Sequence, residues 1–129
     1  MSPYHSHLLA LATPILAAIS QILIKWETRL ASEQFEQLDS KIIFLMHFLL
    51  RPMVIVAFFF TFLSGLTWIL AISKLDLSQA YPYVAITYIL VPSAGIFLFG
   101  EVMSMQKIVG SLVVIVGIGI VMLDGQPAR

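Results

Sequence analysis

The side chains in this sequence that could bind another molecule are polar or aromatic groups set in or beside long apolar stretches. Six of them stand out: Gln21, Lys25, Trp68, Tyr81, Tyr88 and Glu101. An amide or a phenol inside lipid needs a hydrogen-bond partner, because no water is available there. If the glutamine and the aromatic groups converge, they line a cavity that is polar but uncharged. Such a cavity suits a neutral, hydroxyl-rich group better than a cation.

The sequence lacks the patterns that support catalysis or a bound metal. There is no glycine-rich phosphate loop, no H-E-x-x-H motif, no Ser/His/Asp order typical of hydrolases and no pair of carboxylates inside an apolar stretch. His5 and His7 could form a weak metal site, although two histidines at a membrane boundary more often bind nothing. We expect neither an enzyme nor a resident metal or cofactor. The zero net charge gives no reason to expect nucleic acid as a partner.

Charged residues stand at the ends of the apolar stretches. Four of these basic residues usually anchor the topology of a membrane protein, and each could also bind a lipid phosphate: Lys25, Arg29, Arg51 and Lys74. Glu101 and Ser104 precede the last apolar stretch, where carboxylates and hydroxyls favourably cap a helix N-terminus. Capping is the first interpretation for both, and a role of Glu101 in substrate binding or coupling is the alternative.

Composition places these groups in a membrane protein. The chain has 129 residues, of which 60% are hydrophobic and 11% charged, with a mean hydropathy of +0.98. A soluble domain of average composition carries about 25% charged residues. A helix of about 20 residues crosses a hydrocarbon core of roughly 30 Å. We therefore predict an all-α membrane protein with one domain (residues 1–129) of four spans, at residues 5–26, 52–72, 80–100 and 106–123.

The segment between the first two predicted spans has two parts. Residues 27–41 are polar and acidic, and we predict an exposed loop there. Residues 42–50 are apolar but too few to span, which favours a short interfacial helix lying among the lipid headgroups. Together they form the loop and interfacial helix 27–51. Pro52 then suits the first turn of the second span.

Small and polar residues recur on one side of each predicted span. In the first two spans they are Thr13, Ala17, Ser20 and Gln21, and Ala57, Thr61, Ser64, Gly65 and Trp68. In lipid, such stripes face other helices or a wet cavity. Helix–helix contact and a substrate cavity remain equal alternatives for Thr61, Ser64 and Ser111. In the third span one face carries Tyr81, Ala85, Tyr88, Pro92, Gly95 and Phe99, whereas in the fourth Gly110 and Gly117 stack and offer a contact to another helix.

Basic residues predict an orientation. Five of them (Lys25, Arg29, Lys41, Arg51 and Lys107) flank one side of the predicted spans, and two (Lys74 and Arg129) flank the other. The positive-inside rule then places loops 1 and 3 in the cytoplasm and both termini outside.

Short motifs give a family resemblance over nearly the whole chain. The pair Ala80-Tyr81, the run Phe99-Gly100-Glu101 and the seven-spaced glycines Gly110 and Gly117 resemble the small multidrug resistance branch of the drug/metabolite transporter superfamily. The resemblance implies that the glycine face is a dimer contact and that Tyr81 lines a binding chamber. Exporters of that branch hold a glutamate in the first span, where this sequence has Ala17. Without that carboxylate, proton-coupled export of cations has no evident group.

A second branch is a better match. Subunits proposed to flip aminoarabinose-phosphoundecaprenol also lack the glutamate, and they carry a small residue, Gln and a later Lys, as Ser20-Gln21 and Lys25 do here. They share A-Y-P at the start of the third span (residues 80–82) and a glutamate after it, at Glu101. Related four-span proteins of the EamA-like group carry a run similar to residues 71–82.

This resemblance implies the function that we expect. The protein would act in the bacterial inner membrane, as a homodimer or as half of a heterodimer with a similar small subunit. It would pass a polyprenyl-phosphate-linked sugar between leaflets for cell-envelope glycan or lipopolysaccharide modification. Lys25 would hold the phosphate, with Arg51 or Lys74 as further contacts. The alternatives are efflux of small or cationic compounds, coupled through Glu101, and a non-transporting partner of a glycosyltransferase.

Overall fold

A computed structural model describes residues 3–37 and 40–123 of the chain. These residues form six helices and no strand. Within them, four segments are long and apolar enough to cross a membrane: Tyr4–Ser32, Pro52–Ile72, Leu77–Phe99 and Met105–Leu123. The predicted fold class, an all-α protein with four candidate spans, is confirmed.

The first helix, α1 (Pro3–Gln37), is longer than predicted. The prediction of a loop at residues 27–41 is wrong for residues 27–37, which continue the helix; residues 38–39 lie outside the described part. The sequence there is ETRLASEQFEQ, which is rich in good helix formers and has neither Gly nor Pro. A polar composition is compatible with a helix as well as with a loop. At about 1.5 Å per residue, α1 extends well beyond a hydrocarbon core of roughly 30 Å.

A short apolar helix, α2 (Lys41–Leu49), connects α1 to the second span. It has no buried residue, and Ile42 and Met46 are among its exposed side chains. Its location among the lipid headgroups remains a prediction. The second span, α3 (Pro52–Ile72), starts with Pro52 in its first turn, where a missing N–H leaves no hydrogen bond unmade.

Hydroxyl groups join α1 to α3 along their shared length. Ser20 Oγ lies 2.6 Å from Thr61 Oγ1, and Thr13 Oγ1 lies 3.0 Å from Thr67 Oγ1. Ser64 donates to the Thr13 carbonyl at 3.0 Å. The stripes predicted on these two spans therefore contact each other, and Thr61 and Ser64 act as helix–helix contacts.

The third predicted span is not one continuous helix. It consists of α4 (Leu77–Val84) and α5 (Thr87–Phe99), separated by a turn at residues 85–86. Pro82 and Pro92 remove two backbone donors from this span. At the break the Thr87 hydroxyl bonds to the Val84 carbonyl at 2.7 Å, and the Tyr88 N–H donates three residues back, to Ala85, at 3.0 Å. A side chain thus enters the helix ladder and interrupts it.

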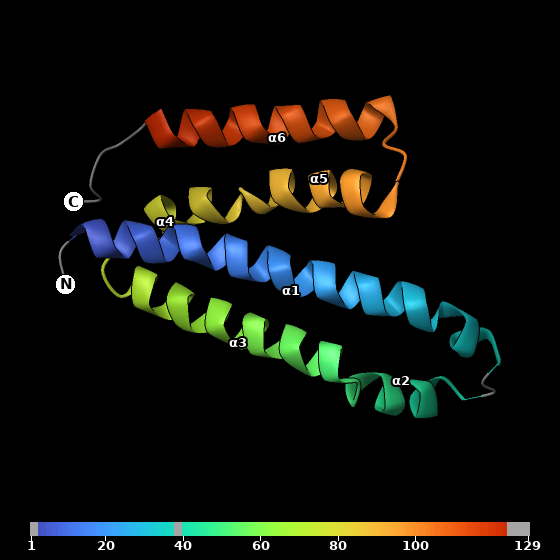
Figure 1. Cartoon of the computed structure of the whole chain (residues 1–129). Coiled ribbons are helices and arrows are strands. Elements are labelled where there is room, and N and C mark those ends of the chain that lie inside the picture. Colours follow the sequence, from blue (N-terminus) through green and yellow to red (C-terminus); the bar gives the residue numbers. More distant parts are fainter. Residues whose placement is uncertain (1–2, 38–39, 124–129) are drawn as a thin grey trace.

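The last helix, α6 (Met105–Leu123), lies at the edge of the molecule. Figure 1 shows the order α3, α1, α4–α5, α6, with the start of α1 and the end of α6 at the same end. Small buried residues (Ala10, Ala71, Leu75 and Ala80) join α1, α3 and α4 near that end. None of the described α6 residues is buried. The outer surface of α6 is therefore not covered by any other described helix.

The hydroxyl pair between α1 and α3 yields a stability prediction. Ser20→Ala and Thr61→Val should each destabilise the protein, and their effects should be coupled by about 0.6 kcal/mol, with about 1.7 kcal/mol as the upper limit for hydrogen bonds between spans. Reversible unfolding in mixed micelles of the two single variants and the double variant measures the coupling. A control cycle of Ser20→Ala with Ser104→Ala, an exposed residue before α6, should be additive. Additivity for Ser20 and Thr61 would contradict the prediction.

Candidate functional site

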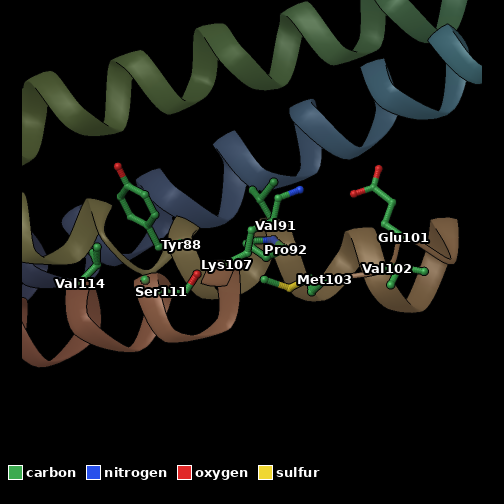
Figure 2. A pocket seen from close by; sticks show the side chains of 10 residues that line it. Tyr88, Val91, Pro92, Glu101, Val102, Met103, Lys107, Ser111 and Val114 are labelled. Atoms are coloured by element: carbon green, nitrogen blue, oxygen red, sulfur yellow. The ribbon is translucent and has the colours of Figure 1, made fainter. Parts of the chain in front are cut away.

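Three cavities follow one another along α5 and α4. The first, of about 290 Å³ and here called the Lys25 cavity, lies between α1 and α5 and is lined by Gln21, Ile22, Lys25, Val91, Ala94, Gly95, Phe99 and Glu101. The second, of about 550 Å³, lies between α5 and α6 and is called the Lys107 cavity (Figure 2); its lining includes Tyr88, Val91, Glu101, Lys107, Gly110, Ser111 and Val114. The third, of about 560 Å³, is called the Tyr81 cavity and is lined by Leu77, Ser78, Tyr81, Pro82, Val84, Ala85, Tyr88, Val114, Ile118 and Val121.

The three cavities share lining residues and so form one series. Val91 and Glu101 belong to both the Lys25 and the Lys107 cavity. Tyr88 and Val114 belong to both the Lys107 and the Tyr81 cavity. Figure 2 shows Tyr88 and Glu101 at opposite ends of the Lys107 cavity, with both side chains directed away from α6. The series extends from the charged end of α5 to the start of α4, the length of a membrane span.

At the charged end, α1 holds the end of α5 by three contacts. Lys25 Nζ lies 3.0 Å from Glu101 Oε1, and Arg29 donates to the Phe99 carbonyl at 3.0 Å. The rings of Trp26 and Phe99 meet edge to face, with centroids 6.1 Å apart. We call these five residues the α1–α5 clasp.

Local sequence explains how Glu101 reaches Lys25. Gly100 has a φ of 65°, a left-handed conformation that ends α5 and turns the chain back. The Glu101 N–H then donates to the Gly95 carbonyl at 3.0 Å. A Cβ at Gly95 would lie 2.8 Å from Glu101 Oε2, so the missing side chain leaves room for the carboxylate. The two glycines place Glu101 against α5, facing α1.

The clasp is weak enough to open. The Lys25 and Glu101 side chains are 55% and 49% exposed, and an ion pair between exposed side chains contributes about 0–1 kcal/mol. The Arg29 contact is exposed as well, so water can replace the guanidinium at the Phe99 carbonyl. The hydroxyl contacts between α1 and α3, by contrast, include the buried Ser64.

The structure brings the six candidate site residues together in two groups. Gln21, Lys25 and Glu101 share the Lys25 cavity, and Tyr81 and Tyr88 share the Tyr81 cavity. Trp68 meets Tyr81 edge to face, with ring centroids 5.7 Å apart, and packs beside the buried alanines. The Lys107 cavity links the groups through Tyr88 and Glu101. The α1 and α3 stripes face each other through paired hydroxyls rather than these cavities.

The predicted cap is correct for Ser104 and wrong for Glu101. Ser104 Oγ accepts the Lys107 N–H at 3.4 Å, at the start of α6. The Glu101 carboxylate instead pairs with Lys25. Gly100 and the close approach to Gly95 direct it there, away from the α6 N-terminus.

The three candidate phosphate ligands lie in different surroundings. Lys25 lines a cavity, whereas the Arg51 guanidinium lies 2.7 Å from the partly buried Glu27 carboxylate. Lys74 lies in the connection between α3 and α4, where α4 begins, whereas Lys25 contacts Glu101 just after the end of α5. His7 Nδ1 and the hydroxyl of Tyr83, in α4, are 2.9 Å apart. Among the described residues, no three His, Cys, Asp or Glu side chains gather as metal ligands would.

Sequence reasoning named Arg29 as one of the basic residues that could bind a lipid phosphate, but it missed Thr28 and Ser32 beside it. With Lys25, Phe99 and Glu101 they line a further cavity of about 340 Å³ beside the clasp. These residues fell in the predicted loop and so were not assigned to a helix face. The signal was present in the spacing, because positions 21, 25, 28, 29 and 32 lie on one side of a helix.

The predicted contact glycines lie on an open surface. A Cβ added at Gly110 or Gly117 would meet no described atom within 4 Å. Gly110 borders the Lys107 cavity, and Gly117 lies one heptad further along the same side of α6. A helix docked on these glycines would therefore border the cavity series.

Comparison with known proteins finds relatives that are named as subunits of one kind of flippase. The chain is 32% identical over 117 residues to a probable 4-amino-4-deoxy-L-arabinose-phosphoundecaprenol flippase subunit ArnF of Erwinia tasmaniensis, covering 86% of this chain and 89% of that protein. It is 32% identical over 126 residues to the ArnF of Pseudomonas fluorescens, covering 95% and 89%. A probable ArnE subunit of Hamiltonella defensa is 42% identical over 59 residues, covering 44% and 53%. No family model and no solved structure matches the chain.

Proposed function

The chain belongs to the family of 4-amino-4-deoxy-L-arabinose-phosphoundecaprenol flippase subunits, and we propose that it moves a polyprenyl-phosphate-linked sugar across the inner membrane. The sugar would serve cell-envelope glycan or lipopolysaccharide modification. The observation that carries this proposal is the series of three cavities along α5 and α4, which begins at charged residues and ends at two tyrosines.

The cavities suit the two chemically different parts of such a lipid. The sugar has hydroxyl groups, for which Gln21 and the phenols of Tyr81 and Tyr88 offer hydrogen bonds without requiring a charge. The polyprenyl chain stays in the bilayer beside α5 and α6, where exposed side chains are apolar. Lys25 is our candidate for the phosphate, since it lines the cavity at the charged end.

The distribution of basic residues supports a direction of entry. Lys25 and Arg29 contact the residues at the end of α5, and Arg51 pairs with Glu27 of α1. Lys74 instead lies in the connection that leads into α4. With the basic end in the cytoplasm, the headgroup enters at Lys25 and leaves beyond Tyr81. Lys74 would then meet the phosphate in the outer leaflet. The Glu101 carboxylate in the cavity lining is paired with Lys25, so it does not serve as a group that couples transport to protons. Net direction would instead come from consumption of the lipid in the outer leaflet.

A second small subunit completes the path in this proposal. Gly110 and Gly117 present open surface along α6, and glycines allow close approach of another helix in lipid. A partner on this face would border the Lys107 cavity and shield the headgroup from lipid tails. The partner is a second copy of this chain or a similar small subunit.

Reconstitution tests the function. Vesicles that contain the protein and its small-subunit partner should exchange labelled aminoarabinose-phosphoundecaprenol between leaflets faster than empty vesicles. Tyr88→Phe should slow exchange by about 2- to 10-fold, the loss of one neutral hydrogen bond of about 0.5–1.5 kcal/mol. Tyr4→Phe, at the exposed start of α1, is the matched control and should leave the rate unchanged. Exchange no faster than in empty vesicles would refute the proposal.

The α6 contact has its own test. Gly117→Leu should break subunit association, because a branched side chain separates helices that approach closely at glycine. Gly119→Leu adds the same bulk about 200° around the helix, where an added Cβ also meets no described atom, and should leave association intact. Energy transfer between labelled subunits in bilayers measures both. Equal association of the two variants would rule out the Gly110/Gly117 face.

A further inference from the structure

We propose that the α1–α5 clasp is a gate opened by a headgroup that carries both a positive and a negative charge. The phosphate of the lipid takes the place of Glu101 at Lys25, and an amine on the sugar takes the place of Lys25 at Glu101. This inference rests on the proposed function and specifies how its site selects a substrate.

The ion pair stands where the cavities meet. Glu101 lines the Lys25 cavity, the Lys107 cavity and the cavity beside Arg29, and Lys25 lines two of these three. A headgroup that passes from the charged end toward Tyr88 therefore passes the pair. The half-exposed side chains are accessible to it from the cavities. Position alone makes the pair a control point for entry.

Exchange of partners explains why the headgroup needs two charges. Separating Lys25 from Glu101 leaves each charge without a partner at a membrane boundary, which is unfavourable. The lipid named for the relatives contains an amine at carbon 4 of its sugar and a phosphate that joins the sugar to undecaprenol. Such a headgroup supplies an anion for Lys25 and a cation for Glu101 at the same time. A headgroup without the amine would leave Glu101 unpaired.

Arg29 extends the anion side of the exchange. It lies four residues after Lys25, one turn along α1, and lines the same cavity as Lys25, Thr28 and Ser32. Two cations can bind the oxygens of one phosphate together, and the Thr28 and Ser32 hydroxyls, which donate to α1 carbonyls at 2.7 and 2.8 Å, would turn to join them. When Arg29 turns from the Phe99 carbonyl to the phosphate, the second contact of the clasp opens with the first.

Opening the clasp moves one part of the protein relative to another. The cations belong to α1, which is joined to α3 by hydroxyl bonds. The anion follows α5 and leads into α6. Because a sugar ring separates the amine from the phosphate, Lys25 and Glu101 must move apart to bind both. The end of α5 and the start of α6 therefore move away from α1 and widen the entrance to the Lys107 cavity.

Two lipids and two variants test this inference in the reconstituted complex. The lipids are aminoarabinose-phosphoundecaprenol and the same lipid with its amine acetylated, which removes the positive charge. The unmodified protein should exchange the amine-bearing lipid about tenfold faster, the factor expected from one charge-assisted hydrogen bond. Glu101→Gln should reduce this preference to about one. Lys25→Gln should slow the exchange of both lipids, since both carry the phosphate.

Two control variants distinguish an effect of the Lys25–Glu101 pair from a general effect of removing a charge. Asp76→Asn removes a carboxylate between α3 and α4, and Lys41→Gln removes an exposed cation from α2; both variants should keep the rate and the preference. Equal exchange of the two lipids by the unmodified protein would overturn the inference and leave the proposed function standing, whichever variants fold. If the protein exchanges neither lipid, the proposed function itself fails.

Discussion

The structure depends on the pairing of hydroxyl groups between α1 and α3. Inside lipid a hydroxyl cannot bond to water, so Ser20 pairs with Thr61 and Thr13 with Thr67, and the three threonine hydroxyls also reach carbonyls of their own helices. This requirement aligns the two helices and uses the small residues of both faces. It also directs the other side of α1, with Gln21 and Lys25, toward α5. The polar residues thus divide into those that hold the protein together and those that line its cavities.

The contacts that hold α4 differ in kind from those that hold α5, and the molecule therefore has two parts. At one end small buried residues join α4 to α1 and α3. At the other end, exposed contacts of the clasp join α5 to α1, and the break at residues 85–86 lies between these two ends. Interrupted spans beside a binding site are a recurrent feature of membrane transporters. An α1–α3 pair joined by hydroxyl groups and an α5 end held by exposed contacts fit alternating access.

Much of this arrangement could be predicted from the sequence, because length and apolarity determine spans and stripes of small residues determine which sides meet. The expected tyrosines do share a cavity, and Lys25 does lie beside Gln21. Polarity misled the prediction at residues 27–37, where good helix formers continue α1 and bring Arg29 to the clasp. The pair of Lys25 with Glu101 depends on the turn at Gly100, which joins residues 76 positions apart. Such contacts follow from tertiary packing and have no local signal.

The opening of the clasp is the central claim, and a distance measurement tests it directly. The chain has no cysteine, so spin labels can be placed at two introduced cysteines, at the exposed positions Leu30 on α1 and Val102 after α5. Pulsed electron resonance in bilayers should show this distance lengthening when aminoarabinose-phosphoundecaprenol is added and staying the same with the acetylated lipid. A reference pair at Leu30 and Met53 should not change with either. An unchanged Leu30–Val102 distance in the presence of the amine-bearing lipid would contradict the account.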